Sequence, residues 1–76
     1  MKIVTLAELR ERKNISQQDL AKELDVAPST IAMYEIGARA PSLDRAKVIA
    51  KYFDVPVETI FFGKRAHKTR ASKKAI

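Results

Sequence analysis

The side chains of this sequence favour contact with a polyanion over catalysis. The sequence has no cysteine and one histidine, His67, so it lacks a thiol nucleophile and a histidine pair that could hold a metal. Its two glycines, Gly37 and Gly63, are too few for a glycine-rich phosphate loop. We therefore expect no enzymatic activity, no metal or other cofactor, and no small-molecule ligand.

The net charge of +6 is concentrated at the C-terminus. Residues 1–63 contain equal numbers of basic and acidic residues, and no acid follows them. The excess cations are Lys64, Arg65, Lys68, Arg70, Lys73 and Lys74. We interpret residues 1–63 as a folded domain and residues 64–76 as a disordered basic tail. Such a tail suits non-specific binding to DNA phosphates, with a purely solubilising tail as the alternative.

The length of 76 residues allows one domain, and an apolar content of 46% is normal for a globular protein. The N-terminal segment carries charge too early for a signal peptide, and no apolar run is long enough to span a membrane. These features predict a soluble cytoplasmic protein.

Helix signals follow one another along the chain, and we see no strand pattern. Thr5 and Glu8 form a capping box for a first helix that runs out near Asn14, and Ser16 caps a second helix, residues 17–24. Pro28 suits the first position of a third helix, which Gly37 should end.

Two further helices are predicted after a loop. Ser42 caps the fourth, whose apolar stripe consists of Leu43, Ala46, Ile49, Ala50 and Phe53. A short fifth helix should cover residues 57–62 and close at Gly63. The chain is thus predicted to be all-α, with five helices.

The second and third helices have the geometry of a helix-turn-helix over residues 17–36. Ala21 is small enough for the point where the helices cross, and Asp25 tolerates the positive φ that the turn requires. The shared core is predicted to be Leu20, Leu24, Val26 and Ile31.

Residues 6–62 resemble the Cro/repressor (Xre-type) family, which has a lambda-repressor-like DNA-binding fold. The matching stretches are Leu9-Arg10-Glu11, residues 16–24, Ser29-Thr30-Ile31, Glu35-Ile36-Gly37, Pro41-Ser42-Leu43 and residues 58–62. The resemblance implies that the third helix enters the major groove of double-stranded DNA. It also implies a homodimer that binds two half-sites about 34–36 Å apart.

The resemblance implies roles for individual residues. Gln17 matches the position that contacts a backbone phosphate, and Arg10 and Glu35 match an ion pair between the first and third helices. The sequence departs from the family pattern in the turn and third helix, where it has Asp25, Ala27, Pro28 and Ile36. We expect the outward face of that helix to offer Ser29 to a base edge and apolar groups to thymine methyls. The candidate DNA-binding residues are Gln17, Ala27, Pro28, Ser29, Thr30, Met33 and Arg39.

These features predict a sequence-specific DNA-binding transcriptional regulator, bacterial or phage-encoded, and a repressor rather than an activator. A palindromic operator is expected, and Phe61 or Phe62 is a candidate dimer contact. Two alternatives stay open. One is an antitoxin or restriction-modification controller of the same fold. The other is a protein-interaction module that no longer binds DNA, because the outward face of the third helix is largely apolar.

Overall fold

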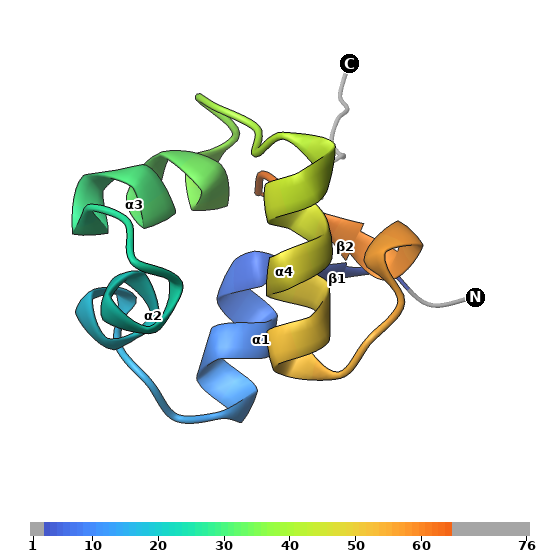
Figure 1. Cartoon of the computed structure of the whole chain (residues 1–76), viewed down its shortest axis with the longest axis horizontal. Coiled ribbons are helices and arrows are strands. Elements are labelled where there is room, and N and C mark those ends of the chain that lie inside the picture. Colours follow the sequence, from blue (N-terminus) through green and yellow to red (C-terminus); the bar gives the residue numbers. More distant parts are fainter. Residues whose placement is uncertain (1–2, 65–76) are drawn as a thin grey trace, which may run out of the picture.

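The computed structural model describes residues 3–64, which form a cluster of helices closed by a two-stranded sheet (Figure 1). The elements are β1 (Val4–Thr5), α1 (Leu6–Arg12), α2 (Gln17–Leu24), α3 (Pro28–Ile36), α4 (Leu43–Phe53), the 3-10 helix η1 (Val57–Thr59) and β2 (Ile60–Phe61). In Figure 1, α2 and α3 form the left side of the molecule, α4 and the sheet form the right side, and α1 lies between them.

Side-chain caps set where the first helices begin. The Thr5 hydroxyl accepts the Glu8 backbone N–H at 3.1 Å, and the Glu8 carboxylate accepts the Thr5 N–H at 2.9 Å. Ser16 and Asp19 make the same reciprocal pair at the start of α2. These bonds satisfy backbone donors that the first turn of a helix leaves without partners.

The turn between α2 and α3 has the geometry that the sequence predicts. Asp25 adopts a left-handed conformation with φ 57° and ψ 48°, and its N–H reaches carbonyls in the last turn of α2. The next amide, that of Val26, donates to the Ala21 carbonyl at 2.9 Å. Pro28 is the first residue of α3, and Gly37 ends that helix with φ 80°. The predicted bounds of both helices are therefore confirmed.

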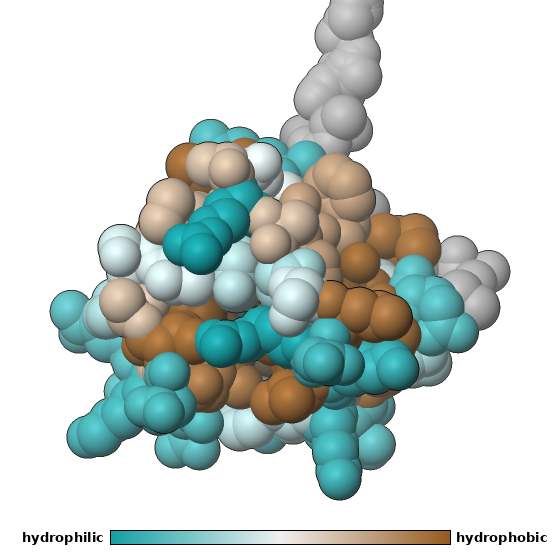
Figure 2. All heavy atoms as spheres, turned by 45° about the horizontal axis from the view of Figure 1, so that its top comes forward, coloured by the Kyte–Doolittle hydropathy of each residue, from teal (hydrophilic) through white to brown (hydrophobic). Residues whose placement is uncertain are grey.

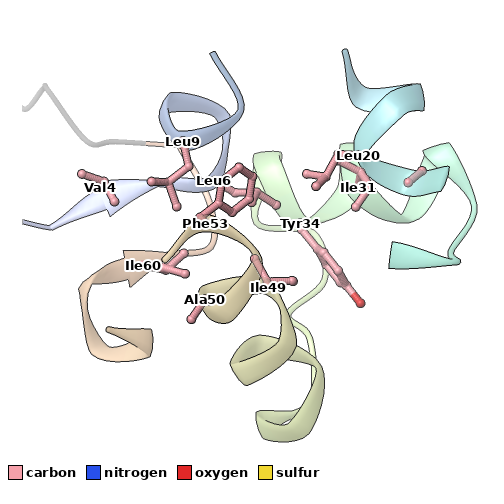
Figure 3. Close-up of a cluster of buried hydrophobic side chains, with 11 residues drawn as sticks. Val4, Leu6, Leu9, Leu20, Ile31, Tyr34, Ile49, Ala50, Phe53 and Ile60 are labelled. Carbon is pink, nitrogen blue, oxygen red and sulfur yellow. The ribbon is translucent and has the colours of Figure 1, made fainter. Parts of the chain in front are cut away.

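One hydrophobic core joins the helices (Figure 3). Its largest fully buried side chains are Leu6, Leu20, Ile31 and Ile49, contributed by α1, α2, α3 and α4. Figure 3 shows Leu20 and Ile31 pointing toward one another from α2 and α3. Since each helix supplies a fully buried side chain, the angle between α2 and α3 is set by packing as well as by the turn.

The prediction of a fifth α-helix over residues 57–62 is wrong. The segment forms one 3-10 turn and then a strand that pairs parallel with β1, with Val4 opposite Ile60 and Thr5 opposite Phe61. The Thr59 hydroxyl donates to the Pro56 carbonyl at 2.7 Å, which favours a local turn over a continued helix. The expectation that the chain has no strand is corrected at the same place.

Leu43 was predicted to lie in the apolar stripe of α4, and it is instead 65% exposed. It is the first residue of α4, where its neighbours Ser42 and Asp44 are exposed as well. The first turn of α4 therefore borders the loop and contributes little to the core. The other members of the predicted stripe are buried, as expected.

The C-terminal end of α3, at Gly37, lies against Gly63, close to the last residue that the structure describes. A Cβ added to Gly37 would lie 3.3 Å from the Cα of Gly63, so the two glycine backbones are in close contact. Gly63 is buried, and Lys64, which follows it, is exposed. The first residue of the predicted basic tail therefore leaves the domain beside the C-terminal end of α3.

Candidate nucleic-acid interface

The inner face of α3 holds the helix on the core. Ile31, Tyr34 and Glu35 are buried, as the sequence predicts. The Tyr34 ring also meets Phe62 edge-on, with 6.0 Å between the ring centroids. Of the two phenylalanines proposed for a dimer contact, Phe62 is therefore part of the support for α3, whereas Phe61 is 47% exposed.

The outward face of α3 contains no charged side chain. Its members are Pro28, Ser29 and Ile36, which are exposed, and Ala32 and Met33, which are half-buried. Ser29 brings a hydroxyl to this face, and Ile36 is 56% exposed. The face can therefore offer one polar group and several methyl or methylene groups to a surface that packs against it.

Glu35 connects three elements at the back of α3. Arg10 donates to its carboxylate from Nε at 2.7 Å and from Nη2 at 3.3 Å, so the ion pair expected from the sequence is present. The Nη1 of Arg10 donates to the Ile15 carbonyl at 2.9 Å. Because Glu35 is only 7% exposed, these bonds compensate for the burial of its charge.

The same contacts keep Arg10 charged. The hydrogen bond to Glu35 is the main cause that raises the pKa of Arg10, partial burial opposes it, and the charges of Glu35 and Glu11 add to the rise. Since a free guanidinium is already protonated at any physiological pH, Arg10 cannot act as a pH switch here.

Gln17, the first residue of α2, is tied into this network. Its Nε2 donates to Glu35 Oε1 at 2.8 Å, which fixes the amide with its nitrogen toward α3. An amide nitrogen carries two hydrogens, so one remains for a second acceptor. The sequence motif marked Gln17 as a phosphate contact but contained no signal for its bond to Glu35, eighteen residues away.

A surface pocket of about 380 Å³ lies beside the start of α3. Ala27 and Thr30 line it from the turn and α3, and Arg39 lines it from the loop between α3 and α4. Ser42 and Arg45 complete it from the start of α4. Sequence reasoning singled out Thr30 and Arg39 separately and missed Arg45, because no local pattern shows that the three side chains converge.

Figure 2 brings the top of Figure 1 forward, toward this part of the surface. Strongly hydrophilic residues lie there among pale residues of intermediate hydropathy, and most of the hydrophobic surface in this view lies lower. This view thus shows strongly hydrophilic residues next to residues of intermediate hydropathy.

Most of the predicted basic tail lies outside the residues that the structure describes. Of its cations, Lys64 is exposed beside the end of α3, and Arg65, Lys68, Arg70, Lys73 and Lys74 lie outside the described residues. Within residues 3–64, no cluster of three or more metal-binding side chains occurs. In that same part of the chain, no helix is long and apolar enough to cross a membrane.

Comparison with known families decides what kind of protein has this geometry. The model of the helix-turn-helix family matches residues 6–60, from the start of α1 to the first residue of β2. The chain belongs to the Cro/repressor (Xre-type) helix-turn-helix family. The Xre-type match covers most of the described chain and includes all four α-helices, whereas β1 and the second residue of β2 lie outside it.

Relatives of this Xre-type domain are transcriptional regulators from archaea and bacteria. An uncharacterized HTH-type regulator of Methanocaldococcus jannaschii is 48% identical over 52 residues, which is 68% of this chain and 79% of the relative. The regulator AnsR of Bacillus subtilis is 38% identical over 69 residues, 91% of this chain and 60% of AnsR. The activator BcrR of Enterococcus faecalis is 34% identical over 58 residues, 76% of this chain and 28% of BcrR.

These relationships support DNA-binding transcription regulation as the general role of the Xre-type domain. The chain spans less than two thirds of AnsR and of BcrR, so each of those proteins has regions without a counterpart here. Since one relative is archaeal, the comparison does not restrict the source to bacteria or phages. No solved structure gave a significant match.

Proposed function

We propose that this Xre-type domain binds specific sequences of double-stranded DNA, with α3 in the major groove, and regulates transcription. The observation that carries the proposal is the outward face of α3, which is exposed at both ends and uncharged, beside an amide held at the start of α2. An α-helix fits the major groove, and the start of a second helix is a favourable place for a phosphate.

The residues of this surface divide by the chemistry they offer. Ser29 can hydrogen-bond a base edge, and Met33 and Ile36 offer apolar contact to the C5-methyl group of thymine. Gln17, Thr30 and Arg39 suit backbone phosphates, which position the protein without specifying sequence. Ala27 and Pro28 are exposed at the start of α3, where small side chains allow a close approach to DNA.

Repression is the mode of regulation that this domain can perform with the least additional structure. A repressor that covers a promoter needs only a DNA-binding unit, and residues 3–64 form such a unit. We accordingly propose a repressor, acting in the cytoplasm where the DNA is. An antitoxin or restriction-modification controller would use the same surface.

We further propose that the protein binds a palindromic operator as a homodimer. Phe61 is the candidate contact, because its side chain is 47% exposed on the short sheet and Ile3, just before β1, is 42% exposed. Sedimentation should show a dimer that Phe61→Glu weakens without unfolding the domain. A wild type that stays monomeric both alone and on DNA would contradict this part of the proposal.

A protein-interaction module is the second candidate, because the exposed Ile36 side chain could pack on a partner helix. Equilibrium binding to a duplex with an enriched sequence and to a random duplex separates the two functions. A DNA-binding regulator should prefer the enriched duplex by at least about 10³-fold, a preference that Ser29→Ala reduces. Equal affinity for both duplexes would favour the interaction module.

A further inference from the structure

The pocket beside α3 combines two cationic side chains that come from different elements. Arg39 is exposed in the loop between α3 and α4, and Arg45 is half-buried in the first turn of α4. Both line the same space of about 380 Å³. Because the two residues are positioned independently by a loop and a helix, their convergence is a property of the fold.

The charges of these arginines are not neutralised within the described part of the chain. Neither guanidinium has an ion-pair partner among residues 3–64, and no carboxylate lines the pocket. Asp44, which directly precedes Arg45, is exposed and lies outside the lining. Glu35 is occupied by Arg10 and Gln17. The pocket therefore keeps a net positive charge that an anion can satisfy.

The remaining lining combines hydroxyl groups and small side chains with Val26 and Tyr34, and beside two arginines it suits a compact oxyanion. Thr30 and Ser42 add hydroxyl groups, and the small side chains of Ala27 and Ala40 leave room near the backbone. Ala27 precedes α3 and Ser42 precedes α4, so the positive ends of two helix dipoles border the same space. Arginine forks match phosphate oxygens in geometry as well as charge.

We propose that this pocket seats one backbone phosphate of the bound DNA and that Arg45 is, with Arg39, a cation that holds it. The inference rests on the proposed function, since a phosphate beside the start of α3 belongs to a strand that borders the major groove. Arg45 is then a positioning contact that sets how far α3 enters the groove, and it contributes affinity without sequence preference.

The test compares Arg45→Ala and Arg45→Lys with Lys47→Ala, an exposed cation on α4 that does not line the pocket. Affinity for an operator duplex is measured from low to high salt, with thermal melting to verify the fold. Arg45→Ala should weaken binding and lower the slope of log K against log salt by about 0.9 per subunit. Arg45→Lys should recover most of the slope, and Lys47→Ala should match the wild type.

A second measurement identifies the phosphate itself. Neutral methylphosphonate linkages are placed one at a time through the operator, and one position per half-site should weaken the wild type but leave Arg45→Ala unchanged. A salt slope for Arg45→Ala equal to that of Lys47→Ala, or no such shared position, would overturn the proposal. Saturable binding of inorganic phosphate that needs Arg45, with normal DNA binding by Arg45→Ala, would overturn the assignment to DNA. A wild type that does not distinguish operator from random duplex would contradict the proposed function instead.

Discussion

Gln17 and Glu35, eighteen residues apart, share a hydrogen bond of 2.8 Å that joins the first residue of α2 to the far end of α3. The donor is the amide proposed to contact phosphate, and the acceptor is the buried carboxylate that also binds Arg10. The orientation of the proposed phosphate contact is thus set by the carboxylate whose ion pair with Arg10 joins α3 to α1.

The first prediction concerns Gln17. Gln17→Ala should weaken operator binding by about 1–2 kcal/mol, roughly 5–30-fold, because it removes a hydrogen bond to a charged DNA phosphate. The free energy of unfolding should also fall by about 1 kcal/mol, because the buried Glu35 carboxylate loses one donor and keeps both bonds to Arg10. Gln17→Glu should bind more weakly still, because its charge repels Glu35 and phosphate alike. The matched control is Gln18→Ala on the exposed neighbouring position, and equal binding by the two alanine variants would refute the contact.

The ion pair itself should be visible as an energetic coupling. In a double-mutant cycle with Arg10→Met and Glu35→Gln, denaturant unfolding should give a coupling of about 0.5–3 kcal/mol. Arg10→Met should be the more damaging single change, because it leaves the buried Glu35 carboxylate without its cation and with the Gln17 amide, at 2.8 Å, as a neutral donor. Additive effects of the two substitutions would show that the pair contributes no specific stability.

Much of the local structure follows from single residues. The caps at Thr5, Ser16 and Ser42 start their helices as expected, and Asp25 and Gly37 take the left-handed conformations that end theirs. Each of these features depends on groups a few residues apart, and such groups lie together in the sequence.

The features that could not be predicted are non-local. The strand at residues 60–61 is too short to show alternation, and it exists because β1, more than fifty residues earlier, pairs with it. The bond from Gln17 to Glu35 and the placement of Arg39 and Arg45 around one pocket likewise depend on how α2, α3 and α4 pack. For the candidate interface, the sequence located α3 and nominated its outward residues as DNA contacts, and those contacts stay predictions. The bonds that connect these residues to other elements required the fold.

Met33 tests whether α3 contacts thymine methyl groups. Met33→Ala should weaken operator binding by about 1 kcal/mol or more, and uracil in place of thymine should remove much of that difference. Because Met33 is half-buried, a small loss of stability accompanies the change and is measured by thermal melting. Val48→Ala, which shortens an exposed apolar side chain on α4, is the control. Wild-type protein that binds the uracil operator as tightly as the thymine operator would exclude methyl contacts.

Residues 64–76 should contribute affinity that depends on salt. Truncation after Gly63 should lower the slope of log K against log salt by about two to four per monomer, because a terminal segment seldom engages all six of its cations at once. The exposed Lys64 begins this segment beside the end of α3, where the proposed DNA surface lies. Sequence preference should survive truncation, since phosphate contacts do not specify sequence. An unchanged slope would leave the segment with no role in DNA binding.

Selection of bound sequences from random duplex DNA at physiological salt tests the central claim most directly. A homodimer that inserts α3 into successive major grooves should enrich a palindrome whose half-site centres lie about 10–10.5 base pairs apart, or a multiple of that spacing. Ser29→Ala should relax the preference at specific positions, whereas Arg45→Ala should weaken binding without altering the motif. Failure of the wild type to enrich any sequence would contradict the assignment of this domain as a sequence-specific DNA-binding regulator.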